Sequence, residues 1–109
     1  MNETVANDKL GAFCRHTHAE LKGAPNGPLA RLTFGVKDIY DIAGHKNGFG
    51  NPDWLRTHEA ASRTAPVVQR LLDAGADMVG KTHTDEITWS LNGENAHYGT
   101  PVNVNAPGR

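Results

Sequence analysis

The feature that most constrains the fold is a helix signal followed directly by a short apolar segment, over residues 64–80. Thr64 can cap a helix whose first turn contains Pro66, a residue suited to a helix start because its missing N–H would have no intrahelical partner there. Apolar residues at 67, 68, 71 and 72 share one face, and Gly75 ends the helix. Residues 77–80 then predict a short buried strand. This order of elements is typical of α/β proteins.

The remaining elements have weaker signals. Leu, Phe, Val and Ile side chains over residues 29–42 predict a strand, with a second short strand at 38–39. Amphipathic spacing predicts a helix over residues 8–21, after a polar segment, 1–8, that we expect to fray. Another helix is expected over residues 84–91, followed by a loop rich in glycine, asparagine and proline.

The charge balance excludes two classes of protein. The 109 residues include 11 Lys and Arg and 12 Asp and Glu, a balance unlike the basic surface of a nucleic-acid-binding or membrane-surface protein. No apolar run approaches the roughly 20 residues of a membrane span, and the N-terminus lacks the pattern of a secretory signal. Cys14 is the single cysteine, so no intramolecular disulfide can form. We expect a cytoplasmic protein with no nucleic-acid partner and no membrane span.

Lys37 is the first candidate for chemistry. It lies in the most apolar predicted strand, where side-chain alternation places it on the same face as Thr33, Gly35 and Ile39. A lysine partly stripped of water is more easily neutral, and a neutral lysine can act as a base. The alternative from the residues alone is an edge-strand lysine that reaches solvent or pairs with Asp38.

Residues 75–82 match the letters G-x-x-x-x-G-K-T of a phosphate-binding loop. That motif needs a strand before its first glycine and a helix after its threonine, so that backbone N–H groups face the phosphates. Here a predicted helix precedes Gly75, the interior is strand-like, and Asp77 would repel phosphate. The context therefore argues against nucleotide binding.

Metal ligands are suggested by two short patterns, but neither has the i, i+4 spacing of the helical zinc-protease motif. The patterns are His16-x-His18 and His83-x-Asp85. We expect no metal and no cofactor.

Nucleophiles are scarce. The serines are Ser62 and Ser90, and neither lies in a G-x-S-x-G turn. Cys14 is expected to pack on a helix face. The polar loop at residues 92–101 could line a pocket or be a solvated surface loop, and its pattern does not decide between them.

Several segments together resemble the amidase signature family, in order over residues 27–109. They are G-P-L at 27–29, F-G-V-K-D at 34–38, A-P-V-V at 65–68, L-L-D-A-G-A at 71–76, G-K-T-H-T-D-E at 80–86 and N-A-H-Y-G-T-P at 95–101. Residues 48–58 and 92–101 resemble more narrowly the plant-type subgroup of indole-3-acetamide hydrolases. These two stretches are equally similar to the amidase-like domain of a chloroplast-envelope docking protein that is regarded as inactive.

The resemblance implies a fold and a mechanism. The fold is the N-terminal part of an α/β/α domain with a mixed central sheet, incomplete here, over residues 27–109, preceded by a helix and linker at 1–26. The family hydrolyses amides with a Ser–cis-Ser–Lys triad, and Lys37 matches the triad lysine. Less directly, Thr88, Ser90 and Asn92 match a wall of the pocket for a small-molecule amide. Lys81 falls at a strand end of the family, which explains the phosphate-loop letters.

The chain departs from the family in one decisive respect. Both triad serines belong to segments that follow the matched region in the family, and neither is present here. We therefore expect a fragment that is inactive alone and that is aggregation-prone, self-associated or only partly ordered in solution. The alternative is a non-catalytic amidase-like binding or docking module.

Overall fold

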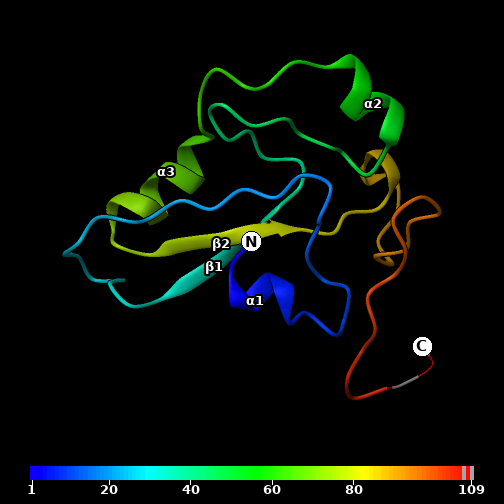
Figure 1. Ribbon diagram of the computed structural model, residues 1–109, viewed down its shortest axis with the longest axis horizontal. Coiled ribbons are helices and arrows are strands. Elements are labelled where there is room, and N and C mark those ends of the chain that lie inside the picture. Colours follow the sequence, from blue (N-terminus) through cyan, green and yellow to red (C-terminus); the bar gives the residue numbers. More distant parts are fainter. Residues whose placement is uncertain (107, 109) are drawn as a thin grey trace.

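The computed structural model describes residues 1–106 and 108 and contains a two-stranded sheet with short helices around it (Figure 1). In chain order the elements are α1 (Glu3–Ala6), β1 (Thr33–Lys37), α2 (Pro52–Thr57), α3 (Pro66–Asp73), β2 (Asp77–Thr82) and the 3-10 helix η1 (Glu86–Thr88). In Figure 1, α3 and α1 lie on opposite sides of the strands. No helix in the described part of the chain has the length and apolar character needed to cross a membrane.

The sheet confirms the predicted α/β class. β1 and β2 pair in parallel, from Thr33 opposite Asp77 to Lys37 opposite Thr82, with one irregularity between Phe34 and Gly35. Parallel neighbours require a crossover connection, and here it includes α2 and α3. The strand predicted over 29–42 is shorter than expected. The extra strand at 38–39 is wrong, because the backbone turns immediately after β1, where two N–H groups donate to the Lys37 carbonyl.

The helix predicted over residues 8–21 is wrong. The Asp8 carboxylate accepts hydrogen bonds from the backbone N–H groups of Leu10 and Phe13, which gives this segment a local alternative to helical bonding. The segment instead runs antiparallel to β2, with isolated bridges from Phe13 to Thr82 and from Leu21 to Met78. The proposed division of the chain between residues 26 and 27 stays a prediction.

The first residues, expected to fray, form α1. The Asn2 side chain caps it by accepting from the Val5 N–H, and Val5 is fully buried. A Cβ on Gly80 would lie 2.9 Å from the Val5 side chain, so glycine in β2 lets α1 approach the sheet closely.

The helix predicted after Thr64 is confirmed as α3, with Pro66 as its first residue. The residue at the N-cap position is Ala65, whose side chain cannot accept a hydrogen bond, so the predicted cap, Thr64, is wrong. The Thr64 hydroxyl instead accepts from the Ala43 N–H. Gly75 follows the helix with a φ of 104°, a conformation that favours glycine. The strand predicted at 77–80 is confirmed as the first four residues of β2.

The core lies between α3 and the sheet. Its buried cluster joins Val68 and Leu72 of α3 to residues of the strands and neighbouring segments, namely Ala19, Val36, Ile42 and Met78. Of the α3 stripe, Val67 is 51% exposed, whereas Val68 and Leu72 are buried. Two of the four stripe residues, Val68 and Leu72, therefore have packing partners within the chain.

The helix predicted over residues 84–91 reduces to η1. Ile87 and Thr88 have positive φ values of 52° and 56°, which break helical geometry. A helix that the sequence did not predict, α2, begins after Asn51, whose side chain caps it by accepting from Asp53 and Trp54.

Candidate active site

Lys37 is the last residue of β1, at the carboxyl end of the parallel pair. In open α/β sheets this end of the strands is where ligands bind. Val36 and Asp38, on either side, are buried, so alternation turns the Lys37 side chain outward, where it is exposed. The expectation of a partly desolvated ammonium is therefore wrong for this chain. Its expected partner Asp38 faces the opposite way.

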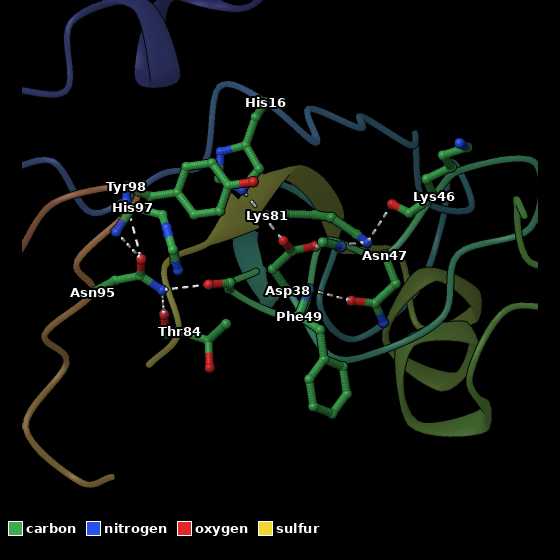
Figure 2. Close-up of polar contacts among 12 residues, drawn as sticks. His16, Asp38, Lys46, Asn47, Phe49, Lys81, Thr84, Asn95, His97 and Tyr98 are labelled. Atoms are coloured by element: carbon green, nitrogen blue, oxygen red, sulfur yellow. Dashed lines mark hydrogen bonds and ion pairs between the residues drawn. The ribbon is translucent and has the colours of Figure 1, made fainter. Parts of the chain in front are cut away.

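Asp38 pairs instead with Lys81 of β2. The Lys81 ammonium lies 3.1 Å from Asp38 Oδ1, and neither side chain has exposed surface (Figure 2). Lys81 also donates to the Lys46 carbonyl at 3.2 Å, and the Gly48 N–H donates to Asp38 Oδ1 at 3.2 Å. A buried charge pair persists only when further hydrogen bonds satisfy it, and these contacts supply them.

The structure around Lys81 also shows why residues 75–82 do not form a phosphate-binding loop although they match its sequence pattern. Gly75 ends α3. Lys81 lies in β2, and its ammonium donates to the Asp38 carboxylate and to the Lys46 carbonyl. No phosphate-cradling turn separates the two residues. The segment is a strand, and the geometry of a phosphate-binding loop is not formed.

Asn95 ties the polar loop to the site. Its buried side-chain amide donates to the carbonyls of Gly50 and Thr84, at 2.8 and 3.1 Å. Its side-chain oxygen accepts from the N–H groups of His97 and Tyr98, at 2.8 and 3.0 Å (Figure 2). The loop at 92–101, which the sequence left undecided, is thus anchored at one end.

Cys14 and His16 also lie next to Asp38, with donor atoms of all three side chains within 4.8 Å of one another. His16 stacks on Tyr98 with ring centroids 3.5 Å apart and an interplanar angle of 4°. Burial raises the pKa of the Cys14 thiol to about 12, and the Asp38 carboxylate adds to the rise. The pattern His16-x-His18, whose spacing argued against a metal site, does not bring the two rings to one place: His18 contacts Glu20 at 2.6 Å.

An aromatic cavity of about 610 Å³ opens beside the turn that follows Lys37. Phe49, Trp54 and His58 form an aromatic wall of it, and the rest of the lining includes the charged residues Asp41, Glu59 and Arg63. Phe49 and Trp54 have centroids 4.9 Å apart, and Trp54 stacks on His58 at 3.6 Å.

The three residues suggested for a pocket wall lie elsewhere. Thr88 is half-buried, and Ser90 and Asn92 are exposed. None of them lines the aromatic cavity. Their role in substrate binding stays a prediction.

Sequence reasoning missed the Asp38–Lys81 pair and its neighbours. The strand period did contain a usable signal: if Lys37 points outward, Asp38 points inward and needs a buried cation. The identity of that cation depends on pairing with β2, 43 residues later in the chain.

The chain belongs to the amidase family, whose model matches residues 4–109. Amidase 1 of Arabidopsis thaliana is 54% identical over 101 residues, which cover 91% of this chain and 24% of that protein. The chloroplastic outer envelope protein 64 of the same plant is 57% identical over 82 residues, covering 75% of this chain and 14% of that protein.

A solved structure gives the same answer for the fold. It comes from a vestigial protein complex linked to the evolutionary origins of an s-triazine catabolic enzyme. It matches with a TM-score of 0.72 and 37% identity over 77% of this chain and 18% of that one. The chain therefore spans about a quarter or less of the length of these relatives.

Proposed function

We propose that this chain is the N-terminal portion of an enzyme that hydrolyses amide C–N bonds, with Lys37 as its catalytic base. The observation that carries the proposal is the position of Lys37. It ends β1 with an exposed side chain, and the residue after it, Asp38, is fixed by the buried pair with Lys81. The Lys37 backbone is thus fixed at the carboxyl end of the parallel strands, with its side chain exposed there.

In the family mechanism, the neutral amine of Lys37 takes a proton from a bridging serine, which takes one from the nucleophilic serine. The nucleophile attacks the amide carbonyl, the C–N bond breaks, and the amine departs with the proton that the serines passed to Lys37. Water then hydrolyses the acyl-enzyme and releases the carboxylic acid. Both serines would come from outside residues 1–109. Ser62 and Ser90 do not match them. We propose that the 109-residue chain alone does not hydrolyse amides.

The substrate class we propose is an aryl amide such as indole-3-acetamide. The aromatic wall made by Phe49, Trp54 and His58 supports it, because stacked rings bind a planar apolar group. Thr88, Ser90 and Asn92 would contact the substrate from another side once the domain is complete. We also propose a cytoplasmic location, in keeping with the single unpaired cysteine.

A chimera tests the proposal. The matched segment of Arabidopsis Amidase 1 is replaced by this chain, and release of indole-3-acetic acid from indole-3-acetamide is measured. Lys37→Ala should lower the rate by about 10²–10⁴, the contribution of a general base. Lys9→Ala, which removes another exposed lysine, is the matched control and should leave the rate unchanged. An active chimera whose rate survives Lys37→Ala would refute the role of Lys37.

The second candidate is a non-catalytic docking module. The observation that favours it is the exposed apolar pair Trp89 and Leu91, 91% and 101% exposed, together with the similarity to outer envelope protein 64. The chimera separates the two candidates. A folded chimera without amidase activity, in which Lys37→Ala changes nothing, favours docking.

A further inference from the structure

Three side chains of different chemistry bring donor atoms close together beside the carboxyl end of β1. The thiol of Cys14, the imidazole of His16 and the carboxylate of Asp38 each offer a donor atom, and these atoms lie within 4.8 Å of one another. Sulfur, nitrogen and oxygen donors in this number are what Zn²⁺ takes in proteins, with a fourth position left for water. We propose that Cys14, His16 and Asp38 bind a zinc ion, or a divalent transition-metal ion with the same ligand preference.

The hydrogen bonds around Asp38 leave room for a cation. Oδ1 accepts from the Lys81 ammonium and the Gly48 N–H, whereas the buried Oδ2 has no hydrogen-bond partner among the described residues. His16 Nε2 is also buried without a partner there, and it lies 3.7 Å from Oδ2, too far for a hydrogen bond (Figure 2). Two buried polar atoms left unpaired destabilise a fold, and one ion between them would satisfy both.

Each ligand is held in place by contacts outside the site. Lys81 and Gly48 fix the Asp38 carboxylate through Oδ1. The ring of His16 is oriented by stacking on Tyr98. The Cys14 N–H donates to the Lys81 carbonyl at 2.8 Å, which joins this ligand to β2. Partners of this kind orient metal ligands and tune their affinity.

The site has space and a route to solvent. A Cβ on Gly48 would lie 2.4 Å from Asp38 Oδ2 and 3.3 Å from His16 Nε2, so glycine keeps the space between the donors open. Cys14 and His16 also line a cavity of about 430 Å³, together with His83, His97 and Tyr98. An ion could enter by that cavity, which a metal site requires.

Binding changes the charge of the site by one unit. The Cys14 thiol loses its proton to solvent as its sulfur binds the metal, and the thiolate offsets one of the two charges of the ion, while the Asp38 carboxylate is shared between the ion and the Lys81 ammonium. The Lys81 ammonium stays on the far oxygen of the carboxylate, 3.1 Å from Oδ1. Asp38 then bridges the ammonium and the metal.

Cobalt and zinc binding to the metal-stripped, reduced 109-residue chain test the proposal. Co²⁺ should give the near-ultraviolet charge-transfer absorption of a cobalt–thiolate bond. Because Cys14 is the single cysteine, that band identifies it as a ligand. Calorimetry with Zn²⁺ should show one ion per chain. His16→Gln should weaken Zn²⁺ binding by at least about 100-fold, since loss of an outer partner alone costs 10–100-fold. Cys14→Ser should abolish the cobalt band.

His18→Gln is the matched control, because His18 lies two residues from His16 and contacts Glu20 instead. It should bind Zn²⁺ like the unaltered chain, with circular dichroism checking that each variant is folded. If a variant fails to fold, the cobalt spectrum of the unaltered chain still decides. The proposal is overturned if that spectrum lacks the thiolate band, if folded His16→Gln binds Zn²⁺ undiminished, or if His18→Gln loses binding.

Discussion

Asp38 and Lys81 form an ion pair with no exposed surface on either side chain, and it links the residue that follows β1 to the last but one residue of β2. Asp38 directly follows Lys37, so the pair fixes the backbone at the residue that we propose as the catalytic base. It also holds the Asp38 carboxylate close to Cys14 and His16. The Asp38 carboxylate therefore contacts β2, follows the proposed catalytic base and provides a ligand of the proposed metal site.

Removing Lys81 alone should be strongly destabilising. Lys81→Ala leaves the Asp38 carboxylate buried and unpaired, and we expect the free energy of unfolding to fall by about 3–5 kcal/mol in urea denaturation. Replacing both residues together by apolar side chains of similar size should cost much less, because no charge then remains buried. Arg56→Ala, which breaks the exposed pair with Asp53, is the control and should change the stability little. A Lys81→Ala chain as stable as the unaltered one would contradict the buried pair.

Asn95 should act as the anchor of the loop that follows it. Asn95→Ala removes the donors to the Gly50 and Thr84 carbonyls and should destabilise the chain by about 1–3 kcal/mol. Hydrogen exchange at the amides of His97 and Tyr98 should become faster, because both lose their acceptor. Asn103→Ala, at an exposed asparagine that bonds only locally, should leave that exchange unchanged. Equal protection in both variants would show that Asn95 is not the anchor.

His83 should make the fold sensitive to acid. Burial lowers the pKa of His83 below its ordinary value of 6.5, so the folded state resists its protonation more than the unfolded state does. The unfolded chain then binds more protons, and stability falls as the pH drops below about 6.5. Urea denaturation between pH 8 and pH 5 should show a shallower fall for His83→Gln than for the unaltered chain. The comparison at pH 8, where His83 is neutral in both states, gives the pH-independent effect of the substitution. Parallel pH profiles would refute the prediction.

The sequence predicted elements whose signals are local. The start of α3 at Pro66, its buried positions and the glycine after it lie within ten residues, and β2 follows directly. The segment at 8–21 was mispredicted because its apolar spacing is outweighed by the Asp8 carboxylate, which binds two nearby N–H groups, and by pairing with a strand about 60 residues away. Elements formed by distant pairing cannot be derived from local periodicity.

In the candidate site, too, the residue with a local signal could be predicted and the residues that depend on distant pairing could not. Lys37 could be found from its place within an apolar predicted strand and from the family motif, whereas its position as the last residue of β1 comes from the structure. The burial of Lys81 could not, because a lysine inside a strand is tolerable only when a carboxylate from another strand reaches it. The convergence of Cys14 and His16 on Asp38 likewise depends on a chain path that had been predicted as a helix.

Self-association of the chain should depend on the apolar side chains it exposes after η1. Trp89 and Leu91 are almost fully exposed, and Ile87 beside them is 42% exposed, an arrangement that favours contact with another apolar surface. We expect light scattering to show species larger than a monomer, and Trp89→Gln combined with Leu91→Gln should shift them toward the monomer. Val67→Gln, at another exposed apolar position on α3, is the matched control and should shift the distribution less. A monodisperse monomer of the unaltered chain would contradict the prediction, because these side chains would then be tolerated in water without a partner.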